Sequence, residues 1–206
     1  ADYQRVLAEL TSSGSLSVQT NFQLAQKVFA LTMRYDAAIS NYLSTYTSTE
    51  ERQDFPQSYG VMFEKVQSLR YGENPHQKAA FYRDVHVSAE PSLVKANKLH
   101  GKELSYNNIA DTDAALDIIK DLTQAKFAAV IIKHANPCGA ASSEVSLKEA
   151  FVKARLADPV SSFGGIVSFN CEVDANTAAE LAEGYFEVIA APSFEQAAVD
   201  ILSKKK

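Results

Sequence analysis

The sequence predicts an α/β protein in which a helical segment precedes a layered domain with a mixed, largely parallel sheet. Two observations carry this prediction. Residues 3–42 place apolar side chains at helical spacing, whereas residues 79–204 alternate short apolar runs with amphipathic segments of helix length. Alternation of this kind is typical of βαβ units, in which helices cover both faces of the sheet.

The first forty residues predict two helices. Residues 3–10 form a short amphipathic set that ends at the breaker run TSSGS. A longer helix follows, because its apolar side chains recur at spacings of 4, 3, 4, 3 and 4 residues and form one stripe. The stripe consists of Leu24, Val28, Leu31, Tyr35, Ala38 and Tyr42. We expect it to pack against a neighbouring domain.

A polar linker separates this segment from the rest of the chain. Residues 44–60 are polar and contain Pro56 and Gly60, which favour a loop at a domain boundary.

Beyond the linker, strands and helices are predicted in alternation. The predicted strands cover residues 79–85, 93–99, 127–132, 165–170 and 186–191, and the predicted helices cover residues 108–122, 144–157, 174–184 and 194–204. The run FAAVII at 127–132 predicts a strand buried on both faces. Asp111 and Asp113 are expected in the first turn of their helix, where carboxylates suit the helix dipole.

Composition excludes several classes of function. Hydrophobic residues make up 46% of the chain and charged residues 22%, as in ordinary globular proteins. The net charge is −5 and no basic patch is present, which disfavours nucleic acid. No signal peptide is recognisable and no apolar run approaches the ~20 residues of a membrane span. The two cysteines, Cys138 and Cys171, show no paired spacing, so we expect both to be reduced thiols. We therefore expect a cytoplasmic protein without a membrane or nucleic-acid partner.

Lys133 and His134 directly follow the buried strand and are the first candidates for chemistry. Adjacent strand residues face opposite sides, so both can enter one site only if the following residues, ANPCG, make a turn. A neutral histidine can accept a proton and a lysine ammonium can stabilise an oxyanion, a pair that suits acyl transfer. The alternative is that both are solvent-exposed residues at the end of a strand.

Three further polar clusters lie near strand ends or in loops. They are residues 69–77, residues 161–165, and the two ends of the strand EVIAAP, which opens with Glu187 and is closed by Pro192 and Ser193. The glycines of 161–165 could bring the backbone close to a phosphate or a ring, although glycines alone favour the simpler alternative of a small-residue turn.

A zinc site is disfavoured. The zinc deaminase pattern H-x-E…P-C-x-x-C requires a glutamate where Asn136 stands and a second cysteine where Ala141 stands. We therefore expect no metal.

Six motifs occur along the chain in a fixed order: LRYGENPHQ, LSYNNIADTDAAL, IIKHANPCG, DPVSSFGG, EVIAAP and ILSKKK. Together with AQKVFALTMRYDAAISNYL, they closely resemble the bifunctional purine-biosynthesis family of aminoimidazole-carboxamide ribonucleotide (AICAR) transformylase/IMP cyclohydrolase. The resemblance implies that residues 1–66 are the helical tail of the cyclohydrolase domain plus a linker. It implies that residues 67–206 are the N-terminal half of the transformylase domain, a cytidine-deaminase-like layered α/β fold without zinc.

The resemblance also implies roles for individual residues. The family transfers a formyl group from 10-formyltetrahydrofolate, a cosubstrate, to the 5-amino group of AICAR. His134 matches the general base and Lys133 the group that stabilises the transition state. The matching nucleotide contacts are Arg70, Tyr71, Asn108, Gly164 and Glu187. These roles agree with the chemistry, because an amine conjugated to a carboxamide is a poor nucleophile and the planar fork of Arg70 suits phosphate.

The resemblance implies that the chain forms a homodimer and that its other partners are the small-molecule substrates. The cyclohydrolase catalytic residues and the second half of the transformylase are expected outside this chain. The alternative is therefore a nucleotide-binding or dimerisation fragment without activity of its own.

Overall fold

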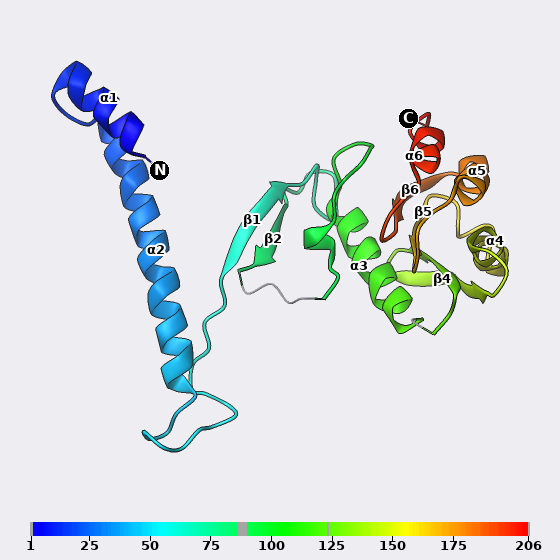
Figure 1. The fold of residues 1–206 in the computed structure, drawn as a ribbon, viewed down its shortest axis with the longest axis horizontal. Helices are drawn as coiled ribbons and strands as arrows, with labels where there is room; N and C mark the ends of the chain where they lie inside the picture. The colour runs from blue at the N-terminus through cyan, green and yellow to red at the C-terminus, as the bar shows by residue number, and fades with distance from the viewer. Residues whose placement is uncertain (1, 86–89, 123, 206) are drawn as a thin grey trace. The chain divides into compact units, whose positions relative to one another are not determined.

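The structure is a computed structural model that describes residues 2–85, 90–122 and 124–205 (Figure 1). It divides into two compact units, Ala1–Phe63 and Glu64–Lys206. Within the described residues, no helix is both long enough and apolar enough to cross a membrane.

The first unit contains the two predicted helices, α1 (Tyr3–Ser13) and α2 (Val18–Ser44). Helix α1 ends at Gly14, whose φ of +68° is the left-handed conformation that glycine adopts without strain. Ser17 directly precedes α2 as its N-cap, and its hydroxyl accepts the N–H of Thr20. Local sequence signals thus define both ends of the α1–α2 connection.

One carboxylate ties the two helices together. Glu9 of α1 accepts a hydrogen bond from the backbone N–H of Ser17 at 2.9 Å and another from the Thr20 hydroxyl. These contacts attach α1 to the start of α2 and leave Thr20 buried.

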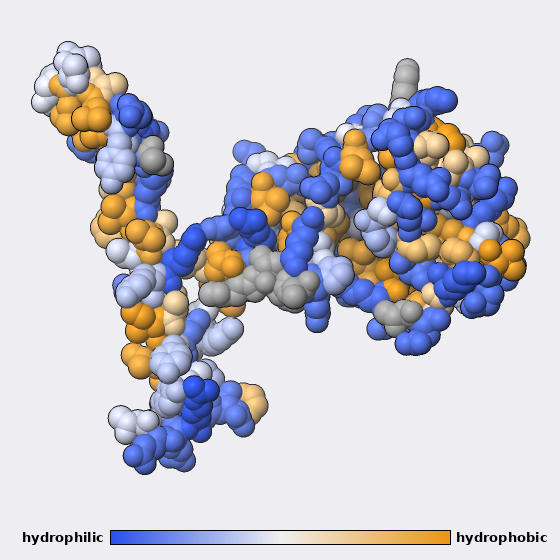
Figure 2. Space-filling view, in the orientation of Figure 1, coloured by the Kyte–Doolittle hydropathy of each residue, from blue (hydrophilic) through white to orange (hydrophobic). Residues whose placement is uncertain are grey.

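The apolar stripe of α2 lies at the surface. Val28 is 55% exposed and Tyr35 is 68% exposed, and Figure 2 shows hydrophobic residues along the surface of α2. Among the described residues of this unit, no large apolar side chain is buried. The stripe was expected to pack against a neighbouring domain, and residues 2–63 do not bury it.

The second unit contains two sheets. A two-stranded sheet pairs β1 (Phe63–Ser68) with β2 (Ala80–Asp84). A four-stranded sheet has the order β4-β3-β5-β6, with β3 at Phe127–Lys133, β4 at Asn136–Ser143, β5 at Gly165–Phe169 and β6 at Phe186–Ala190. The helices are α3 (Tyr106–Asp121), α4 (Leu147–Ala157), α5 (Ala175–Glu183) and α6 (Gln196–Leu202), with a short 3₁₀ turn, η1, at Leu93–Lys95.

The mixed α/β class is confirmed, but the expectation of a largely parallel sheet is wrong. In the four-stranded sheet, β3 pairs antiparallel with both β4 and β5, whereas β5 and β6 pair parallel. The reason is the short connection after β3. Only His134 and Ala135 separate β3 from β4, and a two-residue turn can join antiparallel strands but not parallel ones.

The core lies on both faces of the four-stranded sheet, as predicted for β3. Alternate β3 residues point to opposite faces, so Ile131 packs in one cluster while Val130 and Ile132 pack in the other. The first cluster includes Phe151 of α4 and Leu181 of α5, and the second includes side chains of α3. The helices therefore fix the position of the end of β3 from both sides.

Other local predictions had mixed outcomes. The helices and strands predicted after residue 108 are present, with shifted ends. The strand predicted at 93–99 is wrong, because the chain forms η1 there. Helix α3 begins at Tyr106, earlier than expected, so Asp111 and Asp113 lie beyond its first turn and do not serve the helix N-terminus.

Candidate active site

The turn between β3 and β4 has an unusual backbone. Lys133 pairs with Asn136 across the hairpin, and the two turn residues, His134 and Ala135, have φ values of +53° and +58°. Two-residue hairpins of this kind favour Asn and Gly, because other residues cost about 1–2 kcal/mol each in the left-handed region. A histidine and an alanine stay in this conformation only if the surroundings hold them there.

Asp111 of α3 holds the turn. One carboxylate oxygen accepts the backbone N–H of Ala135 at 2.8 Å, and the other accepts the N–H of His134 at 3.3 Å. The side-chain amide of Asn136 donates to the carbonyl of His134 at 2.8 Å. The turn is thus fixed by side chains from two elements.

The antiparallel pairing of β3 and β5 gathers the predicted site residues. Ile132, near the end of β3, pairs with Ile166, near the start of β5, so the residues before β5 lie at the same sheet edge as Lys133. Strand β6 runs parallel to β5, which places Glu187 at this edge too. A parallel β3–β5 pair would have put these segments at opposite edges.

Lys133 contacts the glycine segment that precedes β5. Its ammonium donates a hydrogen bond to the carbonyl of Phe163. Gly164 has a φ of +72°, its N–H donates to the carbonyl of Tyr185 at 2.8 Å, and a Cβ at this position would lie 3.4 Å from the Lys133 nitrogen. Glycine at 164 therefore allows both the turn and the close approach of the lysine.

Asn108 connects α3 to β6. Its amide nitrogen donates to the carboxylate of Glu187 at 2.7 Å. Its amide oxygen accepts from the backbone N–H and the hydroxyl of Ser105, each at 3.0 Å, in a capping box. The helix cap therefore orients the amide, and the amide orients the carboxylate.

Arg70 and Tyr71 attach to the start of the same helix. The N–H of Arg70 donates to the carbonyl of Leu104 at 3.0 Å, and the N–H of Tyr106 donates to the carbonyl of Tyr71 at 3.1 Å. The guanidinium of Arg70 lies 4.9 Å from the centre of the Tyr71 ring. Helix α3 thus links Arg70 and Tyr71, through its N-terminal end, to Asn108 and Asp111 further along.

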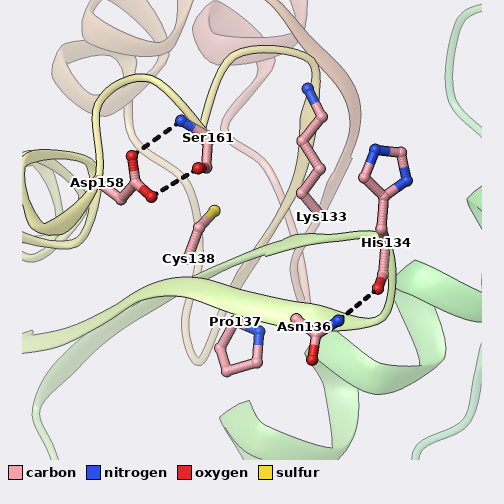
Figure 3. A pocket seen from close by; sticks show the side chains of 7 residues that line it. All are labelled: Lys133, His134, Asn136, Pro137, Cys138, Asp158 and Ser161. Atoms are coloured by element: carbon pink, nitrogen blue, oxygen red, sulfur yellow. Dashed lines mark hydrogen bonds between the residues drawn. The ribbon is translucent and has the colours of Figure 1, made fainter.

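An open cavity of about 350 Å³ lies beside the hairpin (Figure 3). It is lined by Lys133, His134, Asn136, Pro137, Cys138, Asp158 and Ser161. Figure 3 shows the Lys133 and His134 side chains extending from the same end of the hairpin, which meets the requirement that both enter one site.

Two further ionisable groups line this cavity. The hydroxyl and the N–H of Ser161 donate to the Asp158 carboxylate and hold its pKa below the usual range. Burial raises the pKa of the Cys138 thiol, and the nearby Asp158 raises it further. The carboxylate is therefore charged at neutral pH, while the thiol is protonated and weakly nucleophilic.

No described group of three His, Cys, Asp or Glu side chains is arranged to hold a metal ion. The position that a deaminase would give to glutamate is used here by Asn136 to support the turn. Sequence reasoning missed Asp111, Ser105 and Asp158 as parts of the site. The sequence signal for Asp158 was the run DPVSSFGG, in which an aspartate three residues before a serine can cap a turn.

Comparison with known proteins agrees with the motifs. The AICARFT/IMPCHase bienzyme family matches residues 1–206. The chain is 52% identical over 205 residues to the bifunctional purine biosynthesis protein PurH of Halalkalibacterium halodurans. It is 52% identical to the PurH of Oceanobacillus iheyensis and 53% identical to that of Lysinibacillus sphaericus, again over 205 residues. All of this chain is covered, but it spans only 38–39% of these relatives. The chain belongs to the AICARFT/IMPCHase bienzyme family.

Proposed function

We propose that this chain acts in purine biosynthesis and carries the N-terminal half of an AICAR transformylase site within residues 67–206. Residues 1–66 are then the helical tail of the cyclohydrolase domain and its linker. The observation that supports the proposal best is the strained β3–β4 turn, which presents Lys133 and His134 together beside a cavity.

The two side chains suit the proposed reaction. The 5-amino group of AICAR attacks the formyl carbon of 10-formyltetrahydrofolate while His134 accepts a proton from the amine. The Lys133 ammonium stabilises the oxyanion of the tetrahedral intermediate. When the intermediate collapses, the bond to N10 of the folate breaks and the proton held by His134 passes to N10, so the products are formyl-AICAR and tetrahydrofolate.

The remaining candidates suit the nucleotide. Arg70 has the planar guanidinium that pairs well with phosphate. Glu187, oriented by Asn108, can accept hydrogen bonds from hydroxyl or amide donors of the ligand. Gly164 permits close approach to the backbone beside Lys133. We propose that Tyr71 contributes its ring and hydroxyl next to Arg70, and that the protein works as a homodimer.

A second candidate function follows from the extent of the chain. Because it spans 38–39% of its relatives, it could bind the nucleotide or mediate dimerisation without completing a catalytic site. Measuring AICAR binding and formyl transfer separately on this chain distinguishes the two. Binding without turnover would favour the second function.

The role of His134 is tested by His134→Ala in a full-length protein that contains this chain. We expect the rate of formyl transfer to fall by ~10²–10⁴-fold, because a general base is lost, while the dissociation constant for AICAR changes little. His100→Ala, which replaces an exposed histidine elsewhere in the same unit, is the matched control. Unchanged turnover in the His134 variant would refute the proposed role.

A further inference from the structure

Among the described residues, Asp111 is the acidic side chain that accepts hydrogen bonds from both residues of the β3–β4 turn, His134 and Ala135. Both of its carboxylate oxygens are used, one for each N–H. It comes from α3, more than twenty residues earlier in the chain, and is of intermediate exposure. The contact therefore belongs to the tertiary structure and not to a local turn motif.

The geometry of the turn explains why such a contact is required. His134 and Ala135 both have positive φ, and neither is glycine or asparagine. When two consecutive residues adopt this conformation, their N–H groups point in similar directions and create a small site for an anion. A carboxylate fits this site, and its charge strengthens both hydrogen bonds.

We propose that Asp111 is a positioning residue that holds the β3–β4 turn in its left-handed conformation and thereby aims Lys133 and His134 into one site. The inference rests on the proposed function for its catalytic consequence. Its structural part, the control of the turn by Asp111, stands independently of that function.

Helix α3 gives this contact a wider consequence. Asn108 lies three residues before Asp111, about one helical turn, and orients Glu187. One helix therefore sets both the proposed catalytic pair and a proposed nucleotide contact, so the two parts of the site keep a fixed spacing.

The test compares four variants of this chain: Asp111→Ala, Asp111→Asn, Asp111→Ala combined with Ala135→Gly, and the control Asp113→Ala. Asp113 is exposed on the same helix. Residues two positions apart are separated by about 200° around the helix axis, so Asp113 lies on the opposite side of α3 from Asp111. NMR reports the exchange rate of the Ala135 amide and the ring signals of His134.

We expect Asp111→Ala to speed exchange of the Ala135 amide by about tenfold or more and to shift the His134 ring signals. Asp111→Asn should have a smaller effect, because its amide oxygen can still accept one of the two N–H groups. Glycine at 135 should restore the wild-type His134 signals in the absence of Asp111, since glycine adopts positive φ freely. Asp113→Ala should resemble the wild type.

Wild-type exchange and ring signals in Asp111→Ala would overturn the proposal. Failure of Ala135→Gly to restore the His134 signals would also overturn it, because Asp111 would then act on the whole fold. The catalytic consequence is read in a full-length protein, where Asp111→Ala should lower kcat for formyl transfer and leave KM for AICAR nearly unchanged. Altered NMR signals with an unchanged kcat would refute the catalytic consequence of the Asp111 contact, while the structural role of Asp111 would stand and the role of His134 would still be decided by His134→Ala.

Discussion

The two units of this chain use apolar side chains in opposite ways. In Glu64–Lys206, the central strands β3 and β5 of the larger sheet are buried beneath helices on both faces. In Ala1–Phe63, the same kinds of side chain recur at helical spacing along α2 but remain at the surface. A regular apolar pattern therefore predicts a helix in both units but predicts burial only in one.

The two units are held in place by different interactions. The second unit positions Lys133, His134 and Glu187 by core packing and by hydrogen bonds between distant segments. The first unit relies on helix caps and on the Glu9 contacts between α1 and α2. We therefore expect substitutions in the core of the second unit to have much larger effects on stability.

The largest expected effect is that of Phe151→Ala. Phe151 is fully buried and its ring lies 5.5 Å from that of Phe186 and 6.1 Å from that of Phe169. Removing it should lower the free energy of unfolding of the second unit by about 3–5 kcal/mol, through lost burial and a cavity. Phe29→Ala, at a position 72% exposed, should change stability by no more than ~0.5 kcal/mol. Urea unfolding monitored by hydrogen exchange measures the stability of each unit separately. Equal losses of stability in the two variants would contradict the proposed difference between the units.

A pair of glycines gives the next comparison. A Cβ at Gly139 of β4 would lie 1.9 Å from the carbonyl oxygen of Ala154 in α4, so Gly139→Ala should force the two elements apart and destabilise by about 1–3 kcal/mol. A Cβ at Gly14 would lie in open space, so Gly14→Ala causes no clash. Its cost is the strain of an alanine at positive φ, about 1 kcal/mol. Thermal unfolding monitored by circular dichroism compares them. A milder effect at Gly139 than at Gly14 would mean that β4 and α4 are less tightly packed than described.

The smallest expected effect is a shared sensitivity to acid. A hydrogen bond from Lys148 lowers the pKa of Glu180 between α4 and α5, and the Thr20 hydroxyl lowers that of Glu9 between α1 and α2. Because each folded pKa lies below its unfolded value, the stabilising contribution is complete above about pH 4.3 and is lost as pH falls through the folded pKa.

Glu180→Gln and Glu9→Gln should therefore destabilise at pH 7 and have little effect near pH 2. Unfolding curves at the two pH values for wild type and both variants provide the measurement. A variant that is equally destabilised at both pH values would show that its carboxylate charge is unimportant.

Much of the second unit could be predicted from the sequence because its patterns are local. The run FAAVII and the helical periodicity after residue 108 identify elements from neighbouring residues alone. Strand β4 was missed because it begins with Asn136, Pro137 and Cys138 before Gly139, a composition typical of turns. The antiparallel order of the sheet was missed for the same reason.

The candidate site divides in the same way. Lys133 and His134 could be identified because they end a strongly patterned strand and fall within a recognisable motif. Asp111 could not, because its proposed role depends on contact with residues that lie more than twenty positions later. Its position near the start of a predicted helix offered a simpler explanation, the helix dipole, which the true start of α3 at Tyr106 removes.

We propose that the second unit, Glu64–Lys206, carries the nucleotide site at the end of the four-stranded sheet where β3 ends and β5 and β6 begin. The most direct measurement is a titration of the isotopically labelled chain with AICAR in which the chemical shifts of the backbone amides are monitored by NMR. We expect the shifts to centre on residues 133–134, 163–165 and 187. Shifts centred on residues 2–63, or binding that leaves the signals of Lys133, His134 and Gly164 unchanged, would contradict it.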